Sequence, residues 1–296
     1  MPYLPSQKPA LGIILLVLAM LIVPIMDATA KFLSSEYPVL QLVWARFFFH
    51  FLLIAPLALW RHGSNALFPE KPLLQISRGF LILLCTACFW GSIKFIPLAN
   101  AIAILFFHAV IVVGLSVLIL KEQVPKNRWL ASGLGLVAVL MIVRPGFEEF
   151  HWASLLALAA STFFALYILS TRFLAGKAFP LVTLSYQSLG GFVIMTAIVP
   201  FVWVTPTQTD LILMVAMALI GAAGHLLLIR AFEFAEASLL APYLYTEMIM
   251  QAVLGYWFFG DVPDTWAWVG ILLIISVGIF LSLANKETQN PNGKRV

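Results

Sequence analysis

The feature that most constrains this chain is a series of ten long apolar runs, each close to the roughly 20 residues that a helix needs to cross a bilayer. Short segments containing charged residues, proline or glycine separate them. The runs cover residues 9–33, 39–60, 73–94, 97–119, 127–144, 151–173, 181–203, 209–232, 238–259 and 265–284. With the short connections between them, the runs occupy residues 9–284 of the 296. We therefore predict one transmembrane domain over residues 1–296, with no room for a soluble domain.

The composition supports a membrane location for the whole chain. Hydrophobic residues make up 62% of it and charged residues only 10%, whereas a soluble domain has about 45–50% and 25%. Too few charged side chains remain to cover a surface in water, which excludes secreted, nucleic-acid-binding and disordered classes. The runs are continuously apolar and do not alternate as barrel strands do, so we predict an all-α polytopic membrane protein.

The distribution of lysine and arginine predicts the orientation. If the N-terminus is cytoplasmic, thirteen basic residues face the cytoplasm, only Lys31, Lys94 and Arg144 face outside, and Arg46 lies within a span. The cytoplasmic group is Lys8, Arg61, Lys71, Arg78, Lys121, Lys126, Arg128, Arg172, Lys177, Arg230, Lys286, Lys294 and Arg295. Because cytoplasmic loops carry an excess of Lys and Arg, we predict a multi-pass protein of the cytoplasmic (inner) membrane with both termini cytoplasmic and a tail at 285–296.

The two halves of the chain resemble each other when one is slid along the other by about 136 to 141 residues. The matching pairs are Lys31 and Arg172, Lys94 and Arg230, Asn100 and Glu236, and Pro125 and Pro263. Residues 9–144 and 151–284 are therefore predicted to form two five-helix repeats. Because five is odd, equivalent helices cross the membrane in opposite directions. Inverted repeats of this kind support alternating access in transporters; a duplication that serves only folding is the alternative.

Several motifs resemble those of the EamA-type members of the drug/metabolite transporter superfamily. They are Pro97-Leu98-Ala99-Asn100-Ala101, Lys121-Glu122-Gln123-Val124, Arg128-Trp129, Ile142-Val143-Arg144-Pro145-Gly146 and Ala235-Glu236-Ala237-Ser238-Leu239-Leu240-Ala241-Pro242. The resemblance covers essentially the whole chain. It implies a carrier in which the first four helices of each half surround the substrate path, while the fifth and tenth lie at the periphery.

Two details refine the resemblance. Ala109 stands where such proteins often have proline, which argues against a kink in the fourth span and leaves Pro242 in the ninth as the better placed break. The segments 27–31, 41–46 and 242–246 look most like the bacterial riboflavin-uptake type. The resemblance therefore makes riboflavin a candidate substrate.

Charged side chains inside the spans are candidate binding groups, because each costs at least about 2.5–3.5 kcal/mol near the bilayer centre. Glu247 lies near the middle of the ninth span, and Tyr243, Glu247 and Gln251 follow at i, i+4 and i+8 on one helical face. We predict that this face lines the substrate path and that Glu247 binds a proton or a cationic group. A hydrogen bond that only packs helices together is the alternative.

Arg46 and His50 form a second polar face, at i and i+4 in the second span. A guanidinium suits a carboxylate, phosphate or imide oxygen of a ligand, whereas a direct Arg46–Glu247 ion pair would make both charges structural. Asp27 has two candidate partners, Lys31 on its own helix and the deeper Arg46. Lys31 is otherwise expected to extend to the outer surface.

Histidines and aromatic residues complete the predicted binding groups. His108 lies near the centre of the fourth span and His225 within the eighth, where either could relay protons, although a neutral, hydrogen-bonded ring is the more common role. A planar ligand could stack on aromatic rings inside the spans. These are Trp44, Trp90, Tyr167, Tyr186, Tyr243 and Tyr245.

Two short motifs are predicted to serve packing. Cys85 and Cys88 lie in an apolar helix without a second cysteine pair, so we expect buried thiols and no redox or zinc site. Gly221 and Gly224 make a small-residue patch that allows close helix contact.

We predict a secondary transporter that moves a small metabolite, such as riboflavin or a similar planar, polar compound, across the cytoplasmic membrane by alternating access. An exporter of metabolites or amino acids from the same family is the alternative. No nucleotide-binding P-loop, zinc-protease motif or nucleophile elbow occurs. We therefore predict no enzymatic activity, catalytic residue, metal or cofactor, and place an intramembrane enzyme or a lipid-handling protein behind a transporter.

The expected partners follow from this function. They are the small-molecule substrate, membrane lipid and protons if transport is coupled to them. We expect no nucleic acid, and either a monomer or a homodimer.

Overall fold

The described part of the chain contains ten α-helices, one in each predicted span, together with the short 3-10 helices η1 and η2. The computed structural model describes residues 8–67, 69, 71–108, 110–112, 115, 126–143, 150–174, 179–234, 243–244 and 246–289. The helices are α1 (Pro9–Leu33), α2 (Val39–His62), η1 (Gly63–Ala66), α3 (Pro72–Ile93), α4 (Leu98–Leu105), α6 (Lys126–Val143), α7 (Ala153–Leu174), α8 (Pro180–Ile198), η2 (Val199–Phe201), α9 (Gln208–Phe234), α11 (Thr246–Phe259) and α12 (Thr265–Gln289). No strand occurs in these described ranges, which confirms the predicted all-α class.

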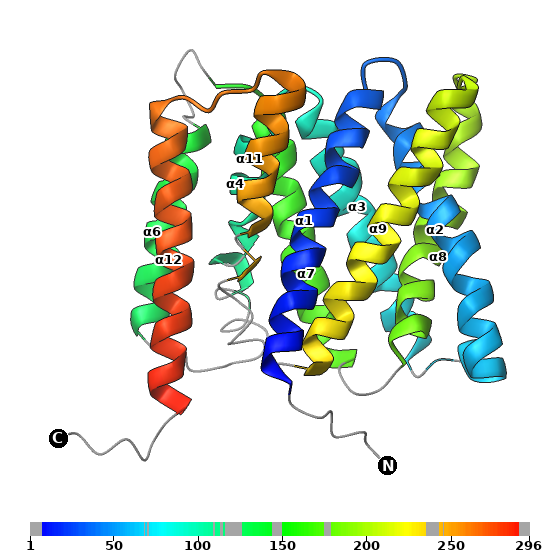
Figure 1. The fold of residues 1–296 in the computed structure, drawn as a ribbon, viewed down its shortest axis with the longest axis horizontal. Coiled ribbons are helices and arrows are strands. Elements are labelled where there is room, and N and C mark those ends of the chain that lie inside the picture. The colour runs from blue at the N-terminus through cyan, green and yellow to red at the C-terminus, as the bar shows by residue number, and fades with distance from the viewer. Residues whose placement is uncertain are drawn as a thin grey trace.

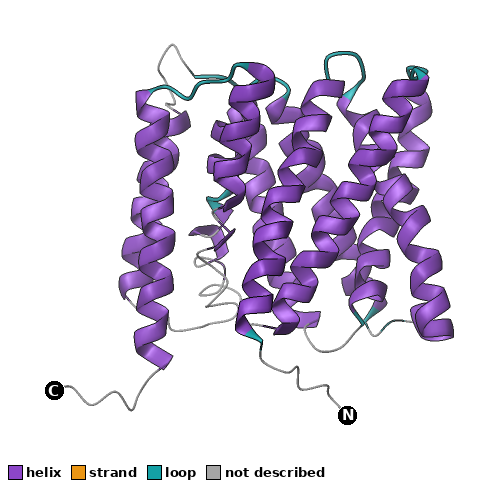
Figure 2. Cartoon of the chain, viewed as in Figure 1, coloured by secondary structure: helices purple, strands orange, loops and turns teal. Residues whose placement is uncertain are grey.

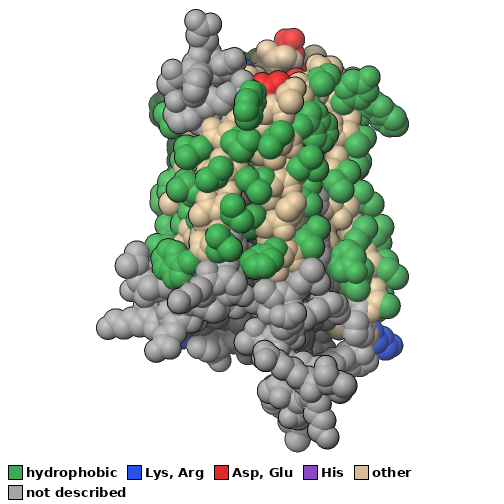
Figure 3. Space-filling view, turned by 90° about the vertical axis from the view of Figure 1, so that its left-hand side faces the viewer, with side chains coloured by type: hydrophobic (Ala, Val, Ile, Leu, Met, Phe, Trp, Pro, Cys, Tyr) green, Lys and Arg blue, Asp and Glu red, His purple; other side chains and the backbone are tan. Residues whose placement is uncertain are grey.

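The helices have the length and surface that a bilayer demands. Six of the described helices are long and apolar enough to cross a membrane, and α4, α6 and α12 contribute shorter apolar stretches. Hydrophobic side chains cover the face of the bundle beside α12, and acidic side chains appear at its upper edge (Figure 3). Exposed apolar side chains such as Leu272 and Phe280 of α12 are therefore placed to meet lipid.

The contacts between helices repeat when the two halves are exchanged. The exchange replaces α1, α2, α3, α4 and α6 by α7, α8, α9, α11 and α12. Contact α1–α9 then becomes α3–α7, contact α1–α11 becomes α4–α7, and contact α2–α9 becomes α3–α8, all of which occur. Contacts α2–α8, α4–α11 and α6–α12 map onto themselves. The chain is thus two inverted five-helix repeats, with the start of α1 and the end of α12 at the lower side of the bundle (Figure 1).

The fifth and tenth spans lie at the periphery, as the family resemblance implies. Helices α6 and α12 pack against each other and reach the remaining helices mainly through α4. They form one edge of the row of upright helices, with α2 and α8 at the opposite edge (Figures 1 and 2).

Close packing of α1 on α9 depends on the predicted glycine patch. A β-carbon at Gly221 would lie 2.5 Å from the sulfur of Met26, and one at Gly224 would lie 2.5 Å from a methyl carbon of Val23. Both distances are far below van der Waals contact. The prediction that Gly221 and Gly224 allow close helix contact is therefore confirmed.

The fourth span contains a break that the sequence did not predict. Helix α4 ends at Leu105, and Phe106 and Phe107 form a turn. The ring Nδ1 of His108 lies 2.9 Å from the Leu105 carbonyl oxygen, so the side chain satisfies an acceptor at the end of the helix. An inserted side chain can interrupt a helix without proline. The expectation for Ala109 itself stays a prediction, because that position lies outside the described residues.

Two other boundaries also differ from prediction. Helix α12 continues to Gln289, so the first residues of the predicted tail 285–296 are helical. Helix α11 begins at Thr246, so Tyr243 precedes it and does not share a helical face with Glu247 and Gln251. Ala109, Pro242, Tyr245 and residues 290–296 lie outside the described residues.

Candidate functional site

The centre of the bundle holds a buried carboxylate with two side-chain partners. Asp27 of α1 is 3% exposed. One of its oxygens accepts a hydrogen bond from Nε1 of Trp90 on α3, and the other accepts one from Nε2 of Gln251 on α11, both at 2.8 Å. The structure thus brings three predicted site residues together from both halves of the chain. The predicted pairing of Asp27 with Lys31 or Arg46 was wrong, because neither forms an ion pair with it.

A buried guanidinium lies beside this carboxylate. Nη1 of Arg46 donates to the hydroxyl of Thr86 at 2.8 Å, and Nη2 lies 3.0 Å from Nε2 of His225. The guanidinium carbon is also 5.4 Å from the centre of the Trp90 ring. Protein groups therefore satisfy both terminal nitrogens of Arg46. The alternative of an Arg46–Glu247 ion pair is not realised, since Lys31–Asp261 is the ion pair found among the described residues.

The contact with Arg46 defines the state of His225. An arginine nitrogen can only donate, so Nε2 of His225 must accept and the ring is neutral with its proton on Nδ1. The ring of His50 lies 6.5 Å away, and its Nε2 is buried without a hydrogen-bond partner. The predicted Arg46–His50 face of α2 therefore points into this polar centre.

Glu247 lies at the margin of the same centre. It occupies the first turn of α11 and is half-buried, and Gln251, which binds Asp27, follows one helical turn later. Residues four apart share a helix face, so Glu247 is on the side of α11 that faces α1. Tyr243, before the helix, is 37% exposed.

A second buried cluster lies lower in the bundle and contains a guanidinium that was predicted to face the cytoplasm. Arg78 of α3 is only 3% exposed. Its Nη2 donates to the hydroxyl of Tyr167 at 2.9 Å and to Oε1 of Gln187 at 3.3 Å. The Tyr167 hydroxyl also donates to Oε1 of Gln187 at 2.9 Å. The assignment of Arg78 to the cytoplasmic surface was wrong, whereas Tyr167 does lie in a polar interior cluster.

Three predicted site residues lie apart from both clusters. Trp44 donates to the hydroxyl of Thr196 at 3.1 Å and packs in an aromatic group with Phe48 and Trp203. The hydroxyl of Tyr186 donates to the Leu67 carbonyl at 2.8 Å, near the lower end of α2. His108 contacts Leu105, and its ring packs edge-on against Phe164 at 4.8 Å. In this conformation these side chains hold helices together.

Sequence analysis left Thr86, Arg78 and Gln187 out of the predicted site. Two signals could have identified them. Arg78, Thr86 and Trp90 follow at i, i+8 and i+12, so all three lie within an arc of about 120° around the axis of α3. The 141-residue offset between the repeats also places Gln187 at the position equivalent to Arg46.

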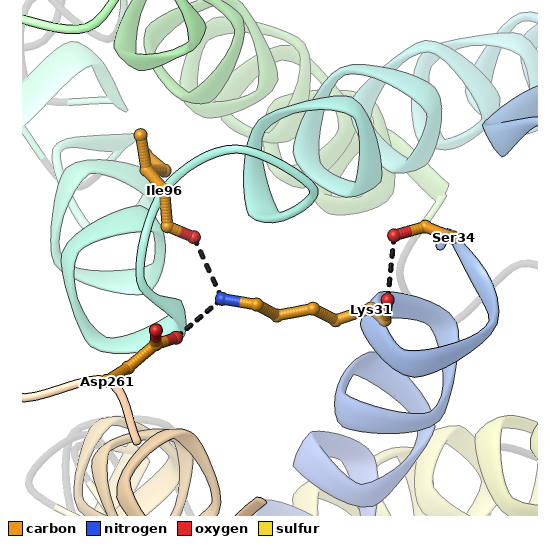
Figure 4. A network of polar contacts seen from close by, with 4 residues as sticks. All are labelled: Lys31, Ser34, Ile96 and Asp261. Carbon is orange, nitrogen blue, oxygen red and sulfur yellow. Dashed lines mark hydrogen bonds and ion pairs between the residues drawn. The ribbon is translucent and has the colours of Figure 1, made fainter. Parts of the chain in front are cut away.

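The upper end of the bundle is tied together by contacts between the two halves. Nζ of Lys31, at the end of α1, lies 2.5 Å from Oδ2 of Asp261 and 3.2 Å from the Ile96 carbonyl (Figure 4). Its charge also lies 4.9 Å from the Phe259 ring. Asp261 follows Gly260, whose φ of +65° turns the chain at the end of α11. Lys31 thus reaches the surface cavity at the upper end of the bundle, where it pairs with Asp261, and we call this contact set the upper latch.

A second tie closes the same end of the bundle. The hydroxyl of Tyr37 donates to Asp210 at 2.7 Å, and the hydrogen bond raises the pKa of Tyr37. The amide of Gln41 bonds the backbone of Val204 in both directions, at 2.7 and 2.8 Å. Both pairs join the first half to the loop and helix start between α8 and α9. At the upper end, the described residues of the two repeats are thus held together by direct contacts.

The described residues offer no metal site. Cys85 is buried, Cys88 is half-buried, and both are free thiols. Within the described ranges, no group of three or more His, Cys, Asp or Glu side chains lies close enough to hold a metal ion. The polar clusters can instead bind charged and hydrogen-bonding groups of an organic molecule.

Comparison with known proteins places both repeats in one family. Residues 10–144 and 151–284 each match the EamA-like transporter family. The chain is 25% identical to an S-adenosylmethionine uptake transporter of Rickettsia prowazekii, over 94% of this chain and 95% of that protein. It is 28% identical to the pseudopaline exporter CntI of Pseudomonas aeruginosa, over 93% and 97%. It is 24% identical to a riboflavin transporter of Rhizobium johnstonii, over 93% and 92%.

A solved crystal structure has the same fold. It matches with a TM-score of 0.66 and 16% sequence identity, over 94% of this chain and 98% of the other.

Proposed function

Because this chain belongs to the EamA-like transporter family, and is therefore a membrane transporter rather than an enzyme, we propose that it is a secondary carrier that works by alternating access. The observation that carries the proposal is the Asp27–Trp90–Gln251 network. It joins α1 and α3 of the first repeat to α11 of the second, around a buried carboxylate. A buried charge of this kind is costly and marks a substrate path.

We propose that the cargo combines a positively charged group with a planar ring. Asp27 is the buried acid that attracts the positive group, and the amide of Gln251 and the indole N–H of Trp90 orient its oxygens. Trp90 and Tyr167 offer aromatic faces at two depths. S-adenosylmethionine carries an ammonium, a sulfonium and an adenine ring, and relatives named for its uptake match most of this chain. We therefore place S-adenosylmethionine first, with uptake as the direction.

Riboflavin is the second candidate for the cargo. A relative named as a riboflavin transporter matches nearly the whole chain, and the planar ring system suits stacking on Trp90. Riboflavin has no cationic group to pair with Asp27, however, so the charge of this site favours S-adenosylmethionine. Export is the alternative direction, because one relative is named as the pseudopaline exporter CntI.

The proposed location is the bacterial cytoplasmic membrane with both termini inside. Removing the buried Arg78 from the thirteen predicted cytoplasmic basic residues leaves twelve against three. That bias still orients the lower end of Figure 1 toward the cytoplasm. Glu247 is the proposed proton-binding group if transport is coupled, and lipid contact and a monomer or homodimer remain predictions.

The test is uptake of labelled S-adenosylmethionine into proteoliposomes containing the purified chain. We expect saturable uptake that Asp27→Asn reduces at least about tenfold, because asparagine keeps the side-chain size but loses the charge and one of the two acceptor oxygens. Glu36→Gln, at an exposed loop position, is the matched control and should transport normally. Normal uptake by Asp27→Asn would refute the binding role. If labelled riboflavin is taken up and S-adenosylmethionine is not, riboflavin becomes the assigned cargo.

A further inference from the structure

The buried guanidiniums of Arg46 and Arg78 differ in how many of their nitrogens form hydrogen bonds with the protein. Protein acceptors bind both terminal nitrogens of Arg46. In Arg78 only Nη2 has partners, whereas Nε and Nη1 are buried without any hydrogen bond. Three of the five N–H hydrogens of Arg78 are therefore unpaired, one on Nε and two on Nη1. A buried cation in this condition is unfavourable unless a ligand completes it.

No protein acid neutralises Arg78 within the described residues. The ion pair found there joins Lys31 to Asp261, at the other end of the bundle. Tyr167 and Gln187 contribute only a hydroxyl and an amide oxygen, and the Tyr167 ring lies 4.8 Å from the guanidinium carbon. The charge of Arg78 thus remains available for an external negative group.

The surroundings of Arg78 are rigid and offer further polar atoms. A β-carbon at Gly79 would lie 2.9 Å from the Tyr186 carbonyl oxygen and 3.1 Å from that of Gln187, so α3 and α8 touch backbone to backbone at this point. Gln75, one turn earlier on α3, is fully buried with its Oε1 unpartnered. Close backbone packing therefore fixes the guanidinium in place, next to an amide that could accept a hydrogen bond from a ligand.

Arg78 lies on the same helix as two residues of the polar centre around Asp27, but well below them. Thr86, which holds Arg46, is eight residues further along α3, and Trp90, which holds Asp27, is twelve. At 1.5 Å per residue these steps are about 12 and 18 Å along the helix. An amino-acid group carries its ammonium and carboxylate on one carbon atom, so it cannot contact Asp27 and Arg78 together. The two clusters must hold such a group in succession.

We propose that Arg78, Tyr167 and Gln187 form a second subsite, which binds an oxyanion of the cargo on the cytoplasmic side of the Asp27 centre. The chemical class is a carboxylate or a phosphate, whose oxygens accept charge-assisted hydrogen bonds from the unpaired N–H groups of Arg78. The identity of the cargo rests on the proposed function, but the oxyanion chemistry of the subsite does not. A free anion such as inorganic phosphate is the other source of the same chemistry.

The first experiment measures binding of S-adenosylmethionine and of its decarboxylated form to the purified full chain. A charge-assisted contact predicts that the wild type prefers the carboxylate form about tenfold or more. We expect Arg78→Gln to reduce this preference below about threefold. Arg61→Gln makes the same change at an exposed arginine and should keep it. A preference that survives in Arg78→Gln but disappears in Arg46→Gln would overturn the proposal.

The second experiment separates the subsite from the cargo assignment. Thermal unfolding is compared in sodium phosphate and in sodium chloride at equal ionic strength. A phosphate-dependent shift in the wild type and Arg61→Gln that disappears in Arg78→Gln supports an oxyanion subsite even if S-adenosylmethionine binds nowhere. If the carboxylate preference is unchanged while this shift is lost, the subsite belongs to a free anion and its assignment to the cargo is overturned.

Stability distinguishes a binding residue from one that only packs helices. Because three donors are unpaired, Arg78→Gln should leave the unfolding midpoint without ligand unchanged or higher. Arg78→Lys retains the charge without the planar fork and should bind with intermediate preference. A marked fall of the midpoint in Arg78→Gln, together with wild-type carboxylate preference and phosphate shift, would show that Arg78 only holds α3, α7 and α8 together.

Discussion

The upper latch should control how often the bundle opens at its upper end, which is the outer end in the proposed orientation. We expect Asp261→Asn, which keeps the side-chain size but removes the charge facing Lys31, to favour the open arrangement. The two side chains are 12% and 21% exposed and lie 2.5 Å apart. They connect α1 of the first repeat to the end of α11 in the second. A movement that separates the repeats at this end must break this contact.

The magnitude follows from the partial burial of the pair. Fully exposed ion pairs contribute about 0.2–1 kcal/mol, whereas breaking a fully buried pair costs about 3–5 kcal/mol. An intermediate value of about 1–2 kcal/mol fits side chains that retain some contact with water. It corresponds to a change of roughly 5–30-fold in the ratio of closed to open molecules. That range is large enough to measure by chemical labelling.

The assay uses a cysteine that is hidden while the latch is closed. Ser92, in the last turn of α3, is fully buried. Ser92→Cys is placed in a background with Cys85→Ala and Cys88→Ala, which removes both native thiols. A neutral, membrane-impermeant polyethylene glycol maleimide is then added from the outer side. Asp261→Asn should raise the labelling rate by roughly 5–30-fold, following the shift in the equilibrium.

A neighbouring lysine supplies the control. Lys94 borders the same surface cavity of about 270 Å³ as Lys31, but it is not part of the latch, so Lys94→Gln should label at the wild-type rate. Equal acceleration by Lys94→Gln and Asp261→Asn would mean that local charge acts on the reagent. Wild-type labelling of folded Asp261→Asn would refute the reasoning.

Three further predictions concern the interior. Glu247→Gln should abolish transport while leaving membrane insertion intact, because a proton or cation site is lost; normal uptake in proteoliposomes would reject that role. Gly79→Ala should lower the unfolding midpoint, because overpacking against backbone costs about 1–3 kcal/mol, whereas Gly133→Ala, with nothing within 4 Å of its new β-carbon, should not. His108→Phe should destabilise the protein by about 1–3 kcal/mol, since the Leu105 carbonyl loses its partner; an unchanged midpoint in denaturant unfolding would contradict the capping role.

The helices were predictable because the bilayer imposes a local requirement. Each span must be long and apolar, and that property can be read from the sequence without knowing its neighbours. The break after Leu105 was not predictable in this way. At this break the side chain of His108 folds back onto the Leu105 carbonyl, and no proline or glycine marks the position. The local hydrophobic pattern is therefore enough to predict the spans, whereas the break after Leu105 was found only in the structure.

The sequence predicted several residues of the candidate site but not which of them contact one another. Asp27, Arg46 and Gln251 are conspicuous because polar groups inside spans are costly. Their partners depend on distances between helices, so the sequence suggested Lys31 or Arg46 for Asp27, whereas the structure has Trp90 and Gln251. Arg78 escaped because it lies only seven residues into its helix, and a position so near the end of a span reads as an interfacial arginine.

The two guanidinium clusters occupy equivalent helix pairs with exchanged roles. In one pair, α2 supplies Arg46 and α9 supplies the accepting His225; in the equivalent pair, α3 supplies Arg78 and α8 supplies the accepting Gln187. The inverted repeat thus places a positive charge toward each end of one polar column. Among the described residues, the upper charge has a carboxylate network beside it, whereas the lower charge has buried donor nitrogens without partners. In the uptake direction that we propose, a cargo group meets an acid first and an unsatisfied cation second. This order suits the proposed release of an amino-acid group into the cytoplasm, since each end of the group is attracted at a different depth.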